Sequence, residues 1–133
     1  MNVLLDTHAL LWSIGRSSEL SECVTTILED GANEVFVSAV SLWEIELKCR
    51  VGKLVLDPLD ISDIPPVCGR LGFTLLPLDA ADVLAAARLN RNRIHKDPFD
   101  RMLIAQCIRH RFTFLSRDTR LAHYKPDGLT WLW

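Results

Sequence analysis

The sequence predicts an α/β fold in which a mainly parallel β-sheet carries helices on both faces. Short apolar runs alternate along the chain with segments of helical periodicity, an order typical of parallel sheets. Several of these runs end on a small polar or acidic residue that starts a helix. The 133 residues, 49% of them hydrophobic, match one soluble globular domain, which we expect to span residues 1–133.

The first strand is expected at Val3–Leu5, where a short apolar run stops at Asp6. Such a run is typical of a strand that is buried on both faces. Asp6 or Thr7 is then the N-cap of a short helix over residues 8–12. A further helix is expected from residue 20 to 31, because apolar residues recur there at helical spacing and Gly31 ends it.

A second strand is expected at Glu34–Ser38, followed by a helix from about Ala39 to Gly52. Glu44 lies beside the apolar stripe of this helix, near its start. The spacing predicts that the stripe is the buried face and consists of Val40, Trp43, Leu47 and Val51.

The second half of the chain continues the alternation. Asp79 is a predicted N-cap, and Asp97 followed by Pro98 is a strong helix-start signal. Asp100 then falls on the inner face of that helix, with Leu103. The expected helices are 64–71, 80–89 and the one opening at 97, and the expected strands are 72–77, 112–116 and 130–133.

Composition excludes several classes of protein. No apolar stretch reaches the roughly 20 residues that span a bilayer, and no basic segment precedes the first apolar run, so we expect a cytoplasmic protein without a membrane segment. The four cysteines lack zinc-ligand spacing and are expected to be buried or half-buried thiols. The net charge of −2 means that any nucleic-acid binding depends on a local basic patch.

Four acids share one kind of position, at the end of a strand or in the first turns of the following helix. They are Asp6, Glu44, Asp100 and Asp118. In a parallel sheet these positions lie on one edge, where ligands bind. Several carboxylates in one cleft raise each other's pKa, and a divalent cation relieves the repulsion.

Oxygen ligands alone suit Mg²⁺ or Mn²⁺, and three or four acids can hold one or two ions. Metal-assisted phosphodiester hydrolysis fits such a site. Each acid also has an ordinary structural explanation, as a helix cap or a turn residue. Thr7 and Ser116 can either orient the neighbouring acids or cap helices.

A basic segment before and within the helix that opens at Asp97 supplies the positive charge that phosphate contacts need. The candidate RNA-binding residues are Arg91, Arg93, Lys96 and Arg101. A solvated loop explains the segment equally well. His95 is expected to be incidental, and Trp12 and Trp43 to be core or interface residues.

Four segments together resemble PIN-domain proteins, and most closely the VapC-type toxins of bacterial toxin–antitoxin pairs. They are Leu4–His8, Ser41–Ile45, His95–Gln106 and Leu115–Asp118, which occur in the family's order and cover essentially the whole chain. The block Asp97-Pro-Phe-Asp-Arg101 is the most specific of them.

The resemblance implies a three-layer α/β/α sandwich around a mostly parallel sheet of about five strands. It implies an Mg²⁺- or Mn²⁺-dependent endoribonuclease, a VapB-like antitoxin that occludes the site, and a homodimer. Asp6, Glu44 and Asp100 match the family's acidic triad, and Asp118 its fourth acid. Asp6, Asp100 and Asp118 are then metal ligands, Glu44 acts directly or through water, and Asp97 is the less favoured ligand.

Two other functions are compatible with the residues. Asp6 at the end of a first strand also suits an aspartate nucleophile in phosphoryl transfer, although such enzymes usually carry a second Asp two residues later, where this chain has His8. A catalytically silent RNA- or partner-binding module would use the same acids only structurally.

Overall fold

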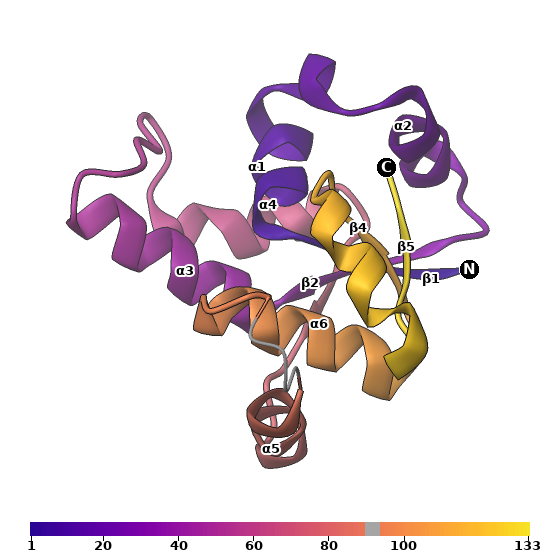
Figure 1. Cartoon of the computed structure of the whole chain (residues 1–133). Coiled ribbons are helices and arrows are strands. Elements are labelled where there is room, and N and C mark those ends of the chain that lie inside the picture. The colour runs from indigo at the N-terminus through magenta and orange to yellow at the C-terminus, as the bar shows by residue number, and fades with distance from the viewer. Residues whose placement is uncertain (90–93) are drawn as a thin grey trace.

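A computed structural model describes residues 1–89 and 94–133 and contains one parallel sheet. The strands are β1 (Asn2–Leu5), β2 (Glu34–Ser38), β3 (Thr74–Leu76), β4 (Thr113–Leu115) and β5 (Thr130–Leu132). Their order is β3-β2-β1-β4-β5, and every neighbouring pair is parallel (Figure 1). The expected edge position of the third strand is confirmed.

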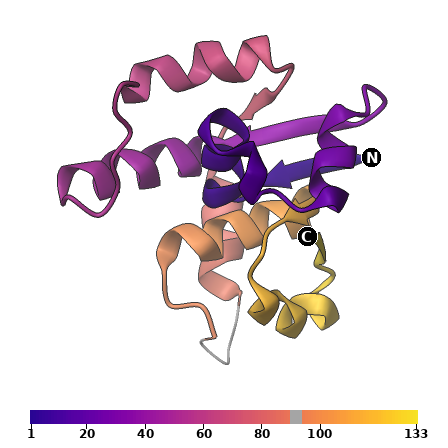
Figure 2. The ribbon, with the colours of Figure 1, turned by 90° about the horizontal axis from the view of Figure 1, so that it is seen from above.

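Helices cover both faces of this sheet, which confirms the three-layer α/β/α prediction (Figures 1 and 2). The α-helices are α1 (Thr7–Gly15), α2 (Glu22–Glu29), α3 (Ala39–Arg50), α4 (Ile64–Arg70), α5 (Ala80–Arg88) and α6 (Pro98–His110). The 3₁₀ helices are η1 (Ser17–Glu19), η2 (Ile61–Asp63) and η3 (Thr119–Asp127).

Strand β1 separates two hydrophobic cores, because successive side chains of a strand point to opposite faces. Val3 and Leu5 join the core beneath α1, α2 and α4. Leu4 joins the core beneath α6 and η3. All three side chains are fully buried, as the apolar run predicts.

Acidic N-caps begin three of the helices at the positions that the sequence indicates. The Asp6 carboxylate accepts a hydrogen bond from the Ala9 amide, Asp79 caps α5, and Asp97 caps α6 ahead of Pro98. Each side chain satisfies an amide that has no partner inside its helix.

The buried face of α3 agrees with the predicted one only in part. Val40 is buried as expected and Leu47 is half-buried, but Trp43 and Val51 are 51% and 66% exposed. Ser41, Glu44 and Ile45 are buried instead, because α3 packs against α1 and α6 and its inner face is shared between the core and the polar site. An apolar stripe alone therefore predicts only part of the buried face of this helix.

The thiols follow the expectation with one exception. Cys68 and Cys107 are buried and Cys49 is half-buried, but Cys23 is exposed because it lies on the solvent side of α2. Within residues 1–89 and 94–133, the helices are too short or too polar to cross a membrane.

The strand order places a crevice between β1 and β4. From β1 the chain builds the sheet toward β2 and β3 on one side, while β4 and β5 extend it on the other. In open α/β sheets the carboxyl ends of strands at such a reversal leave a ligand-binding crevice. Leu5 pairs with Leu115, so Asp6 and Ser116 leave the sheet side by side.

A buried polar network joins α5, α6 and β2 away from this crevice. Asp82 is fully buried and is ion-paired with Arg109. The Gln106 amide nitrogen donates to Asp82 Oδ2 at 3.0 Å, and Ser38 Oγ donates to Gln106 Oε1 at 2.6 Å. Burial alone would raise the pKa of Asp82, but the hydrogen bonds and Arg109 together lower it.

Replacement of Asp82 by Ala is expected to destabilise the fold by about 2 to 3 kcal/mol, because Gln106 and Arg109 lose a buried partner. Urea unfolding measures this loss. Asp127→Ala, at an exposed position at the end of η3, is the matched control and should change stability by less than about 0.5 kcal/mol. Equal effects of the two substitutions would contradict a structural role for the network.

Candidate active site

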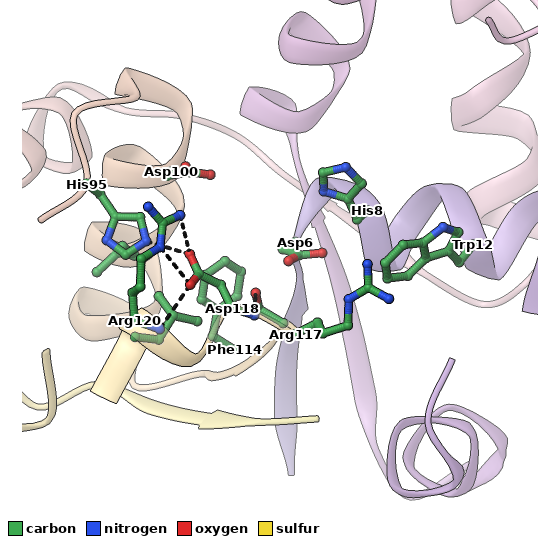
Figure 3. Close-up of a pocket in the computed structure, with 12 residues that line it drawn as sticks. Asp6, His8, Trp12, His95, Asp100, Phe114, Arg117, Asp118 and Arg120 are labelled. Carbon is green, nitrogen blue, oxygen red and sulfur yellow. Dashed lines mark hydrogen bonds and ion pairs between the residues drawn. The ribbon is translucent and has the colours of Figure 1, made fainter. Parts of the chain in front are cut away.

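A pocket of about 260 Å³ opens at the crevice between β1 and β4 (Figure 3). Three of the four candidate acids line it, namely Asp6, Asp100 and Asp118. The pocket wall also contains Ser116, His95 and cationic side chains that follow β4. The predicted convergence of these acids at one sheet edge is therefore what the structure shows.

Asp6 lies where β1 passes into α1. The Asp6 amide donates to the Leu115 carbonyl at 3.1 Å, and Asp6 Oδ1 accepts from the Ala9 amide at 2.7 Å. Burial raises the pKa of the Asp6 carboxyl, and hydrogen bonds from Ser116 and Ala9 only partly offset it. Among the described residues Asp6 has no ion-pair partner, so its negative charge is poorly compensated.

Asp100 lies in the first turn of α6. Asp97 Oδ1 accepts from the Phe99 amide at 2.8 Å and acts as the N-cap, which leaves the Asp100 side chain directed at the pocket. Burial, followed by the charges of Asp97 and Glu44, raises the Asp100 pKa to about 6. The expected division between a capping Asp97 and an inward Asp100 agrees with this geometry.

Glu44 approaches the site from α3 but does not line the pocket. The Thr7 hydroxyl donates to Glu44 Oε1 at 2.6 Å and lies 3.0 Å from Ser41 Oγ. Lys48, one helical turn on, forms an ion pair with Glu44 Oε2. Burial would lower the pKa of Lys48, but its bond to Glu44 raises it instead. Thr7 thus orients a carboxylate, one of its two predicted roles.

Asp118 follows β4, and both of its oxygens are already paired with Arg120. Arg120 Nε donates to Oδ1 at 2.9 Å and Arg120 Nη2 donates to Oδ2 at 2.8 Å. His95 Nε2 lies 2.7 Å from Oδ2. Burial would raise the Asp118 pKa, but the bonds with Arg120 and His95 outweigh it and hold the pKa well below its ordinary range.

His95 is not an incidental loop residue. Its side chain is 1% exposed, and its Nδ1 lies 2.9 Å from the Tyr124 hydroxyl, so a buried imidazole connects Tyr124 to Asp118. No pattern in the sequence indicates this pairing, since 23 residues separate His95 from Asp118. The ion pair of Lys48 with Glu44, by contrast, could have been predicted from the sequence, because residues four apart on one helix are neighbours.

Of the predicted RNA-binding residues, the two that the structure describes, Lys96 and Arg101, do not line the pocket. Arg91 and Arg93 fall outside the described residues, and Lys96 is exposed. The Arg101 guanidinium donates to the Ala86 and Leu89 carbonyls at 2.8 and 2.6 Å, at the end of α5. These bonds give Arg101 a structural role, and its RNA contact stays a prediction.

Two of the acids fit a divalent cation that keeps part of its water shell. Within residues 1–89 and 94–133, no group of three or more acidic, histidine or cysteine side chains is close enough to enclose a metal ion. Mg²⁺, however, usually keeps several waters and binds through one or two carboxylates. Asp6 and Asp100 suit it because burial raises the pKa of each and neither has an ion-pair partner in the described chain.

The chain belongs to the PIN domain family, which matches residues 3–126. Ribonuclease VapC22 of Mycobacterium tuberculosis is 26% identical over 130 residues, which cover 96% of each protein. The resemblance read from the sequence is therefore confirmed at the level of the family.

Toxin–antitoxin complexes are among the solved structures with this fold. VapBC2 from Rickettsia felis, solved with a promoter DNA fragment, superposes with a TM-score of 0.68 at 14% identity, covering 99% of this chain and 98% of that one. VapBC-1 from nontypeable Haemophilus influenzae gives 0.68 at 16% identity and covers 99% and 97%. FitAcB from Neisseria gonorrhoeae gives 0.61 at 21% and covers 98% and 96%.

Without metal, Asp100→Asn is expected to stabilise the protein at pH 7 but not at pH 4. The folded pKa of Asp100, about 6, exceeds the ordinary value of 3.8, so the folded state loses stability as the pH rises between these two values. Thermal unfolding in EDTA at both pH values measures the effect. A difference in Tm between variant and parent that does not change with pH would contradict it.

Proposed function

We propose that the protein is a metal-dependent endoribonuclease that acts as the toxin of a toxin–antitoxin pair. The observation that carries the proposal is the contrast among the four acids. Glu44 and Asp118 are neutralised by Lys48 and Arg120, whereas Asp6 and Asp100 share a pocket without an ion-pair partner in the described chain. Family membership and the relative named as a ribonuclease support the same activity.

Asp6 and Asp100 are the residues assigned to hold Mg²⁺ or Mn²⁺. Such an ion supplies an activated water and neutralises charge on the phosphate. Glu44 is buried and does not line the pocket, so we assign it a role through water, with Thr7 and Lys48 fixing its orientation. Asp118 lines the same pocket and helps directly or through water, and Asp97 remains the cap of α6.

The partners follow from the family and its neighbours. RNA is the substrate that we assign, and a VapB-like antitoxin is the protein partner, since several structures with this fold are VapBC complexes. We also assign a homodimer in the cytoplasm. Co-expression with the neighbouring small gene product and measurement of molar mass by light scattering test the antitoxin and the homodimer.

Asp6→Asn is expected to lower RNA cleavage by more than about 100-fold, beyond the 10- to 100-fold typical of residues that only support a metal ligand. The reason is that the substitution removes the negative charge of a proposed metal ligand, a carboxylate with no ion-pair partner in the part of the chain that the structure describes. Cleavage of total RNA with Mg²⁺, and with EDTA in its place, measures the effect. Undiminished cleavage by Asp6→Asn, or cleavage in EDTA, would refute the proposed mechanism.

Thr7→Val is expected to lower the cleavage rate by about 10- to 100-fold, because it leaves Glu44 in place but removes the hydroxyl that orients it. Thr7→Ser keeps the hydroxyl and is the matched control, with activity close to that of the parent. Comparison of the kcat values of the two variants shows whether the hydroxyl is what supports cleavage. A Thr7→Ser variant as slow as Thr7→Val would show that the hydroxyl is not what matters.

A further inference from the structure

Two arginines that follow β4 belong to the same pocket as Asp6 and Asp100. Arg117 and Arg120 both line the pocket, and both are exposed (Figure 3). They lie outside the basic segment that the sequence singles out. Asp6 and Asp100 make the interior of the pocket acidic. The two exposed arginines add a basic rim.

Each arginine is held in place by a different neighbour. Asp118 binds Arg120 through Nε and Nη2, in the two-bond geometry that fixes a guanidinium most firmly. Arg117 lies over the ring of Trp12, with its Cζ 4.6 Å from the ring centroid, and Trp12 in turn packs edge-on against Trp133. Neither guanidinium therefore has to be ordered when a ligand binds.

A buried chain of hydrogen bonds supports Arg120 from behind. The Tyr124 hydroxyl contacts His95, and His95 contacts Asp118. The Arg120 side chain nevertheless remains 59% exposed. An arginine has five N–H donors, and the two bonds to Asp118 leave others for a ligand.

We propose that Arg117 and Arg120 form a two-arginine clamp that binds the RNA phosphates next to the bond that is cut, and that Asp118 and His95 are positioning residues for this clamp. The inference rests on the proposed function and refines it. Asp118 then acts on Arg120 rather than as a direct metal ligand, since both of its oxygens are engaged by donors.

A phosphodiester chain is the ligand that matches this arrangement. Its charges repeat along a flexible backbone, so one phosphate can face Asp6 and Asp100 with their cation while its neighbours contact the rim. Arginine binds phosphate through two parallel hydrogen bonds, a geometry that lysine cannot supply. A small anion has no neighbouring phosphates to contact the arginines, so nothing would offset its repulsion by Asp6 and Asp100.

Salt dependence of RNA binding tests the clamp directly. For single strands, each phosphate that the protein neutralises adds about 0.7 to the steepness with which log Kobs falls with log salt concentration. Measured on the Asp6→Asn chain with a fluorescent single-stranded RNA in EDTA, Arg117→Ala and Arg120→Ala should each reduce this slope by about 0.7, and the double variant by about 1.4. Arg120→Lys keeps the charge and should restore most of the slope.

Arg50→Ala is the matched control, because Arg50 is an exposed, ion-paired arginine at the end of α3. It should leave the slope unchanged. If Arg120→Ala lowers Tm without changing the slope, the Arg120–Asp118 pair is purely structural and the clamp is overturned. An RNA affinity that none of the variants alters would overturn it as well.

Asp118→Asn separates the clamp from a metal-ligand role. With the clamp, this variant raises KM for RNA because Arg120 loses its fixed orientation, while its half-saturating Mn²⁺ concentration stays within about twofold of the parent. A tenfold rise in that concentration, with KM for RNA unchanged, would make Asp118 a metal ligand and overturn the proposal. If the Asp6→Asn chain binds no RNA and the parent cleaves none, the ribonuclease function itself fails.

Discussion

The structure depends on holding several carboxylates together at the carboxyl edge of a parallel sheet. Asp6 has no freedom to move away, because its amide is bonded to Leu115 and its carboxylate caps α1. Asp100 enters the same pocket from the first turn of α6. Burial disfavours the ionised form of each, and the charge of Glu44 acts in the same direction on both, which is why the pKa of each lies above its ordinary value. The surrounding residues are arranged around this excess charge.

Among the described residues, the ion pairs of the site form with the outer acids, Glu44 and Asp118, and none forms with Asp6 or Asp100. Lys48 pairs with Glu44 within one helix, and Arg120 with Asp118 within one turn, so both pairs form locally and need no long-range rearrangement. Thr7 and His95 then fix these two carboxylates from distant parts of the chain. This division leaves the two central acids as the place where an added cation is bound most favourably, because Lys48 and Arg120 are already committed to the outer acids.

The sequence predicted the strands, the caps and the meeting of Asp6, Asp100 and Asp118 well, because these features depend on local patterns and on the geometry of parallel sheets. It predicted the inner face of α3 only in part, since Val40 is buried as expected but Trp43 is not. Hydrophobic periodicity assumes that a helix buries its apolar stripe, whereas α3 buries Ser41 and Glu44 and exposes Trp43. The burial of His95 was also missed, since no local pattern signals its hydrogen bonds with distant side chains.

The sequence and the structure differ in which arginine is available to a ligand. Arg101 belongs to the most specific motif of the chain, yet it donates to carbonyls at the end of α5 and ties that helix to α6. Arg120 belongs to no motif, yet it stands at the pocket and is exposed. A guanidinium that satisfies buried carbonyls is needed for the fold, and one that is oriented by a carboxylate beside open space is available to a ligand. Charge count along the sequence cannot separate these two cases, but the partners of each guanidinium do.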